Sequence, residues 1–205
     1  MLYIIVLKEK LMGYAKYILI HDFDASKELD ELSKKLWTKT STLCPTATPP
    51  KLSNHVSIIP PFNASDEVIF ALTMGVEMFW AGFTGHMHND VEILHLPKVF
   101  RNADADVLYL PVVFPKSYVL LVESIRGQIN NFGSWVHELP TKKFNPHITL
   151  AKGKNLFETL EAHRILSGEI DGRRSTSVVV PVNKPVILKK ETGGTWTEVQ
   201  YKTRI

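Results

Sequence analysis

Apolar residues recur along the chain at two spacings, which predict alternating strands and helices. Short apolar or alternating runs, such as residues 14–21, are typical of half-buried strands. Elsewhere apolar residues fall three or four positions apart, as on one face of a helix. Four helices are predicted, marked by Leu29, Leu32 and Leu36; by Val68, Leu72, Val76 and Phe79; by Leu121, Ile125 and Ile129; and by Leu156 and Leu160. The pattern indicates a fold of mixed helices and strands.

Turn and loop residues divide these elements. A segment rich in Thr and Pro, residues 39–54, predicts a loop. Residues 91–96 and 107–113 are expected to pair as strands, and residues 186–190 form a closing hairpin with a strand that begins at Thr197. Residues with capping side chains precede three of the helices: Ser26, Ser65 and Asn155.

Two short segments share one pattern, in which a histidine lies two residues before a hydroxyl residue. They read NHVSI at 54–58 and NPHITL at 145–150. A lysine lies four positions before each histidine, at Lys51 and Lys143, and a helical pattern follows each motif. Alternate side chains of a strand point to the same face, so each histidine shares a face with its hydroxyl. The repeat predicts two similar lobes in one bilobal domain.

Length and composition agree with one compact domain. The chain has 205 residues, 44% of them hydrophobic, and no segment has the character of a linker. We expect residues 1–13 to be an N-terminal extension and residues 14–205 to be the domain. The apolar run at residues 2–7 is too short for a membrane span and lacks the features of a secretory signal. With Cys44 as its single cysteine, the chain favours the cytoplasm over an oxidising compartment.

The repeated pair of side chains suits acid–base chemistry on a phosphodiester without a metal or other cofactor. Two imidazoles titrate near neutral pH, so one can accept a proton while the other donates one. Hydroxyls can donate hydrogen bonds to the phosphate oxygens. Residues 139–157 contain four lysines and no acid, and residues 51–65 contain one lysine and no acid. The candidate catalytic residues are therefore His55, Ser57, His147 and Thr149.

Those two motifs resemble the marks of the 2H phosphoesterase superfamily, which includes the enzymes called 2′-5′ RNA ligases and cyclic phosphodiesterases. The resemblance extends over residues 14–205, and Ser57 stands where threonine is commoner. It implies an α+β fold in which two antiparallel sheets with pseudo-twofold symmetry flank a central cleft, with helices outside. It also implies metal-independent cleavage of RNA-type phosphodiesters: 2′-5′-linked oligonucleotides, 2′,3′-cyclic phosphates or cyclic oligonucleotide signals.

Substrate contacts are expected from residues near the motifs. Phe62 and Phe144 are candidates to stack on a base, with Tyr17 as a weaker one. Lys152, three residues after Thr149, is the candidate cation on the phosphate side. The expected partner is a nucleotide, an oligonucleotide or an RNA terminus, bound by a monomer away from membranes.

Two alternatives stay open. A cleft with two histidines and two hydroxyls could bind a nucleotide without turning it over. His86 and His88, in an H-x-H-x-D pattern, could instead bind a metal ion for hydrolysis, although the further histidine that such a signature needs is absent at Val91. The sequence does not decide which motif histidine is the acid and which the base.

Overall fold

The computed structural model describes residues 15–23, 26–52, 54–83, 90–101, 105–131, 144–171, 177–191 and 193–199, so the predicted extension at residues 1–13 lies outside the described residues. The elements of the described part follow one another as β1 (Ala15–Asp22), α2 (Lys27–Leu43), β2 (His55–Ala64), α3 (Asp66–Phe83), β3 (Asp90–Leu94), β4 (Lys98–Arg101), β5 (Asp106–Val113), α4 (Lys116–Asn131), β6 (His147–Gly153), α5 (Leu156–Asp171), β7 (Ser177–Pro181), β8 (Val186–Lys190) and β9 (Trp196–Glu198).

The four predicted helices are present, and local capping explains where two of them begin. The Ser26 side chain accepts a hydrogen bond from the backbone N–H of Leu29 at the start of α2. Asn155 does the same for Phe157 at the start of α5. Helix α2 continues to Leu43, past the predicted loop boundary at residue 39. In this last part of the helix the threonine hydroxyls donate to carbonyls one turn earlier, as Thr40 does to Leu36, so they are satisfied within the helix.

None of these helices, within the described residues, is both long and apolar enough to cross a membrane.

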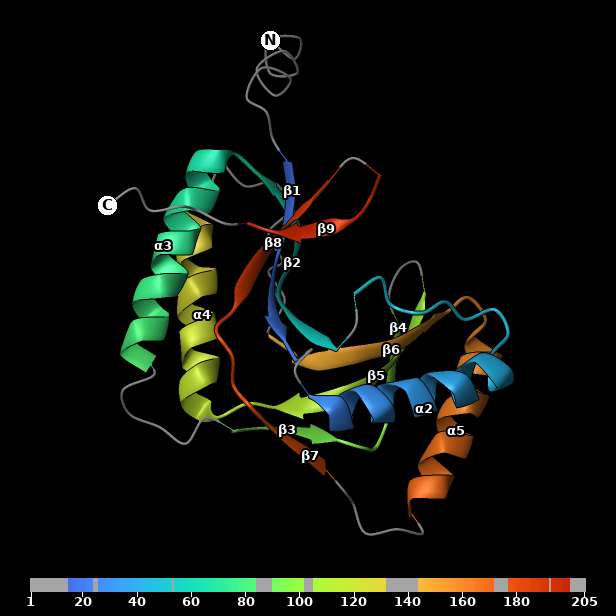
Figure 1. Ribbon diagram of the computed structural model, residues 1–205. Coiled ribbons are helices and arrows are strands. Elements are labelled where there is room, and N and C mark those ends of the chain that lie inside the picture. The colour runs from blue at the N-terminus through green and yellow to red at the C-terminus, as the bar shows by residue number, and fades with distance from the viewer. Residues whose placement is uncertain are drawn as a thin grey trace.

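The strands form one continuous, largely antiparallel path (Figure 1). Their order is β7-β3-β5-β6-β2-β1-β8-β9, and β4 pairs with β5 beside this path. The predicted pair of antiparallel sheets corresponds to the two halves of this path, which meet where β2 pairs with β6. This confirms the predicted fold class, with the two sheets joined through their motif strands.

An internal repeat explains the position of those two strands. The order β1-α2-β2-α3 is repeated as β5-α4-β6-α5, and the second strand of each unit lies at the centre of the sheet. The helices cross between units: α2 packs with α5, and α3 packs with α4. An approximate twofold relation between the units therefore places the two motif strands side by side.

Two predicted pairings differ in detail from the structure. The strands at 91–96 and 107–113 do pair, but only through the ends of β3 and β5, at Glu92–Val113 and Ile93–Val112. On the edge of β5 away from β6, the first half of the strand, Asp106 to Tyr109, pairs with β4, a four-residue strand that was not predicted from the sequence. The closing hairpin forms between β8 and β9, and β9 is confined to Trp196–Glu198.

Candidate active site on the motif face

Both motif histidines are the first residues of their strands. Strand β2 begins at His55 and β6 begins at His147, and the two strands pair antiparallel with Val56 opposite Ile148. In an antiparallel pair, that register places His55 beside Thr149 and Ser57 beside His147. The four predicted catalytic residues therefore lie on one face of two adjacent strands. We call this face of the sheet the motif face.

Burial alternates along both strands as this arrangement requires. Val56 and Ile148 are buried in the main core, as are Ile58 and Leu150. The four motif residues are each half-buried. The strands thus anchor themselves through one face and present imidazoles and hydroxyls on the other.

The imidazole of His147 is held on two sides. Its Nδ1 lies 2.8 Å from the backbone carbonyl oxygen of Asn145, which can only accept, so Nδ1 carries the proton. The rings of Phe100 and Tyr109 lie 5.1 and 5.2 Å from its ring, both edge-on. Burial lowers the pKa of His147 below its ordinary value, and the bond to Asn145 opposes this shift. The neutral ring therefore leaves Nε2 as the acceptor.

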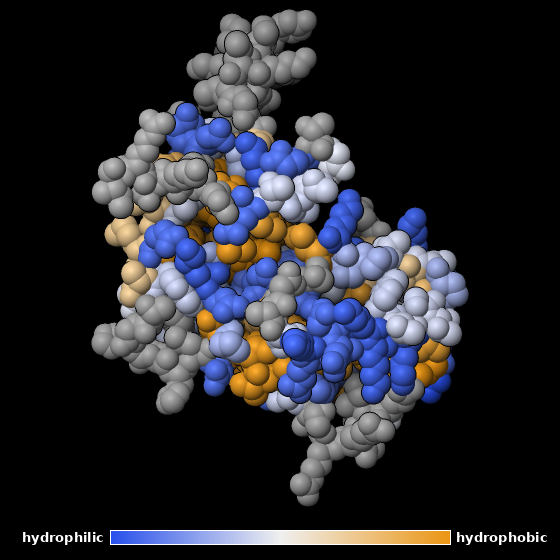
Figure 2. Space-filling model, in the orientation of Figure 1, coloured by the Kyte–Doolittle hydropathy of each residue, from blue (hydrophilic) through white to orange (hydrophobic). Residues whose placement is uncertain are grey.

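The surroundings of His55 and Ser57 come from β1. Asp22 pairs with His55, and Ile20 pairs with Ser57. Ile20 belongs to a small apolar cluster that also contains Ile18 and Leu188, with Trp196 packed against it. Figure 2 shows apolar residues gathered over β1 and β8, with hydrophilic residues around them. The residues of β1 that pair with the first motif are therefore Asp22, opposite His55, and the buried Ile20, opposite Ser57.

A β-bulge decides where Lys152 lies. Thr149 pairs with Tyr109 but Ala151 pairs with Leu108, so β6 contains one extra residue at Leu150. Simple alternation would turn Lys152 away from the motif face. After the bulge, Lys152 pairs with Val107, two residues from Tyr109 on β5, and so returns to the same face as Thr149. Its side chain is exposed there.

The three aromatic residues predicted to stack on a base are in the core. Tyr17, Phe62 and Phe144 are 1%, 0% and 9% exposed, and Tyr17 packs against Phe62 while its hydroxyl bonds to Asp66. Rings buried this deeply offer no face to a ligand, which does not support the stacking role proposed from sequence.

The aromatic residues at the site are instead Phe100 and Tyr109, both half-buried. Phe100 pairs with Val107, and Lys98 pairs with Tyr109, so β4 contributes a ring and an exposed cation to the motif face. Sequence reasoning missed these residues. The signal available was the single tyrosine within the aliphatic run of residues 107–113.

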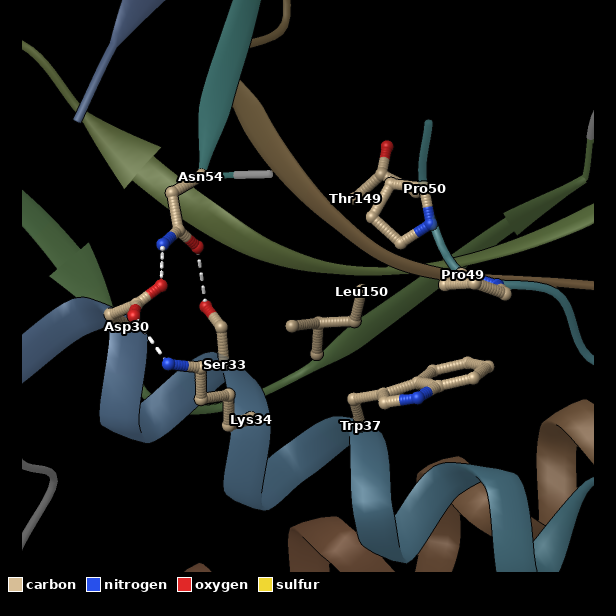
Figure 3. A pocket seen from close by; sticks show the side chains of 9 residues that line it. All are labelled: Asp30, Ser33, Lys34, Trp37, Pro49, Pro50, Asn54, Thr149 and Leu150. Atoms are coloured by element: carbon tan, nitrogen blue, oxygen red, sulfur yellow. Dashed lines mark hydrogen bonds and ion pairs between the residues drawn. The ribbon is translucent and has the colours of Figure 1, made fainter. Parts of the chain in front are cut away.

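A pocket of about 200 Å³ lies behind Thr149, between α2 and the chain that leads into β2 (Figure 3). Its apolar part is formed by Trp37, Pro49, Pro50 and Leu150. At its polar end Asn54 bonds to two α2 side chains, Asp30 and Ser33. The residue that precedes His55 is thus tied to the helix below.

Two histidines outside the motifs, His86 and His88, belong to the metal alternative. His86 and His88 lie outside the described residues. Among residues that are described, no group of three or more His, Cys, Asp or Glu side chains is arranged to hold a metal ion. His21 is a core residue that bonds to the Tyr118 hydroxyl, and burial lowers its pKa to about 3.

The chain is similar to known proteins in its structure rather than in its sequence. Neither a protein-family model nor a curated protein matches the sequence. Among solved structures, LigT from E. coli, complexed with 3′-AMP, matches with a TM-score of 0.57 at 13% identity, over 92% of this chain and 97% of that one. TT0787 of Thermus thermophilus matches with a TM-score of 0.52 at 16% identity, over 90% and 95%.

A third structure, described as a phosphoesterase, matches with a TM-score of 0.51 at 13% identity, over 91% of this chain and 95% of that one. These proteins are 2H phosphoesterase superfamily members. At such identities the likeness concerns the fold, and it extends over nearly the whole chain. The resemblance that the two motifs indicated is confirmed at that level: the protein has the fold of the 2H phosphoesterases.

Proposed function

We propose that the protein is a metal-independent phosphodiesterase that cleaves RNA-type phosphodiesters on the motif face. The observation that carries the proposal is the pairing of Val56 with Ile148, because it brings two histidine–hydroxyl pairs from distant parts of the chain onto adjacent strands. The fold shared with 2H phosphoesterases supports this reading.

In this proposal His147 is the general base. Its neutral form is favoured by burial, and the Asn145 carbonyl fixes the proton on Nδ1. The lone pair on Nε2 can then take the proton from the attacking oxygen, which is either a water or a neighbouring ribose hydroxyl. A ribose hydroxyl attack gives a cyclic phosphate, and water attack opens one.

His55 is then the general acid. As the new P–O bond forms, the bond to the leaving ribose oxygen breaks, and that oxygen receives a proton from the imidazolium of His55. His55 takes this role because His147 is assigned as the base, and the cross-strand neighbour of His55 on β1 is Asp22. The proton balance closes, because the base gains one proton and the acid loses one.

Ser57 and Thr149 are proposed to bind the phosphate. Each lies beside the histidine of the other strand, so their hydroxyls can donate to the non-bridging oxygens between the two imidazoles. Lys152 and Lys98 add positive charge on the same face. The half-buried rings of Phe100 and Tyr109 are the proposed stacking surface for a base.

The first test is turnover in the presence of EDTA. The purified protein is incubated with 2′,3′-cyclic nucleotides, 2′-5′ and 3′-5′ oligoadenylates and cyclic oligonucleotides, and the products are separated by chromatography. We expect cleavage of ribose-containing substrates, none of DNA, and loss of cleavage in the double variant His55→Ala with His147→Ala. His163→Ala, a histidine on the outer helix α5, is the matched control and should keep its activity.

Three results would each contradict one part of the proposed function. Cleavage that EDTA abolishes would contradict the metal-independent mechanism and favour the metal alternative. Turnover that survives the double variant would overturn the site. Saturable nucleotide binding with no turnover would indicate a nucleotide-binding module rather than an enzyme.

A further inference from the structure

The backbone at Asn54 is in a conformation that side chains disfavour. Its φ is 38°, and it is the one non-glycine residue with a positive φ among those that the structure describes. The left-handed region costs an L-residue about 1 kcal/mol or more, and asparagine tolerates it better than most. Such a conformation persists when the surrounding structure holds it, and it often marks a functional site.

Three hydrogen bonds hold Asn54 in place, two of which are seen in Figure 3. Its side-chain Nδ2 donates to Oδ1 of Asp30 over 3.0 Å, and its Oδ1 accepts from the Ser33 hydroxyl over 2.7 Å. Its backbone carbonyl accepts from the N–H of Phe23 over 3.0 Å. Asn54 is 3% exposed, and its two side-chain hydrogen bonds are partly buried. The three bonds join the start of β2 to helix α2 and to the end of β1.

The carboxylate of Asp30, which accepts from Asn54, is ionised at neutral pH. Lys34 donates to its other carboxylate oxygen over 2.7 Å. That hydrogen bond holds the pKa of Asp30 below its ordinary value, so the carboxylate is ionised at neutral pH and always accepts from Asn54. The anchor therefore does not depend on protonation in the range where histidines work.

We propose that Asn54 is a positioning residue, which fixes the direction in which β2 begins and thereby aims the imidazole of His55 at the leaving oxygen. This inference rests on the proposed function. His55 follows Asn54 directly, so a rotation of the Asn54 backbone moves the imidazole. Displacement of a catalytic group by about 1 Å can cost on the order of 100-fold in rate.

The experiment uses two substrates that differ in their need for an acid. In 2′-5′ diadenylate the leaving ribose oxygen must be protonated. In adenosine 2′-(4-nitrophenyl phosphate) the leaving phenolate departs without a proton. We expect Asn54→Ala to lower kcat on the diadenylate by about tenfold or more, with KM changed less, and to leave the nitrophenyl ester unchanged.

Two further variants separate positioning from stability. Asn155→Ala is the matched control, because it removes an asparagine with two side-chain hydrogen bonds at the start of α5, away from the motif face. It should unfold at a lower temperature, yet keep kcat on both substrates. Asn54→Asp places two carboxylates together and should lose activity, whereas combining it with Asp30→Asn re-forms the hydrogen bond with donor and acceptor exchanged and should restore kcat.

An equal loss on both substrates, or no loss on either, would overturn the positioning role while leaving the proposed function intact. If the wild-type protein cleaves neither these two substrates nor the other phosphodiesters named above, the proposed function fails, and the NMR signals of the His55 ring then decide the positioning role. Signals displaced by Asn54→Ala and not by Asn155→Ala support it, and signals unchanged by both overturn it.

Discussion

The strands β2 and β6 carry the same motif but hold their histidines in different ways. His147 is fixed through its own ring, by the carbonyl of Asn145 and by the edges of Phe100 and Tyr109. At the first motif, hydrogen bonds to α2 anchor Asn54, the residue before His55. The second motif thus has contacts on the histidine ring itself, and the first has an anchor on the backbone beside its histidine.

This difference has a chemical consequence. In the proposed mechanism, the Nδ1 bond to the Asn145 carbonyl holds His147 in the tautomer whose Nε2 accepts a proton, which suits a base. His55, whose cross-strand neighbour is Asp22, takes the role of the acid. Approximate symmetry of the backbone thus does not give symmetry of proton transfer, and the two halves can divide the roles of base and acid.

The largest expected loss of kcat comes from removing each histidine in turn. We expect both His147→Ala and His55→Ala to lower kcat on 2′-5′ diadenylate by about two to four orders of magnitude, the usual share of a general acid or base. On the nitrophenyl ester, which needs no acid, His55→Ala should recover most of its activity and His147→Ala should not. Recovery in His147→Ala alone would reverse the two roles.

Removing either motif hydroxyl is expected to cause the next largest loss of kcat. Thr149→Val and Ser57→Ala each remove one donor to the phosphate, and we expect each to lower kcat by roughly 10- to 100-fold with a smaller change in KM. Thr149→Ser keeps the hydroxyl and serves as the control, since the other strand already carries serine. A change confined to KM would show that the hydroxyls bind the ground state and the transition state equally.

Much of this site was accessible from the sequence, because the motif pattern depends only on local alternation. That rule does not reach the residues predicted to stack on a base. Two register shifts separate Phe62 from Ser57 in the pairing of β2 with β1, and Phe144 precedes β6, which begins at His147. Their burial at 0% and 9% could therefore not be derived from the alternation of the motif residues.

Other features depend on pairing between distant segments. The bulge at Leu150 returns Lys152 to the motif face, and it becomes visible only from the register of β5 against β6. Phe100 reaches His147 because β4 pairs with β5, and four residues carry too little periodicity to be predicted as a strand. The contacts of His147 with Phe100 and Tyr109 could therefore not be derived from its sequence neighbours.

Removing the charge of Lys152 is expected to have a smaller effect, on KM. We expect Lys152→Ala to raise KM for oligoadenylates by about three- to tenfold, because it removes a cation on the motif face near the phosphate. Lys154→Ala, two residues further along and past the end of β6, has the same charge change and should alter KM little. The difference between the variants should shrink as salt is added, since screening weakens both contacts. Equal effects would indicate a general attraction rather than a bound phosphate.

The smallest expected effect concerns the pH at which the base becomes active. The acid-side limb of kcat/KM reports the free enzyme's base, and the lowered pKa of His147 places that limb below about 6.5. Phe100→Ser lets water reach the ring, which favours the charged imidazole and raises the pKa towards its ordinary value. The limb should therefore move up by a fraction of a pH unit, so activity at pH 6 falls relative to activity at pH 8.

Phe157→Ser, at an exposed position on α5, should leave the limb where it is. A limb that Phe100→Ser does not move would mean that His147 is not the group titrating there, and that the direct restraint of its ring serves the acid instead.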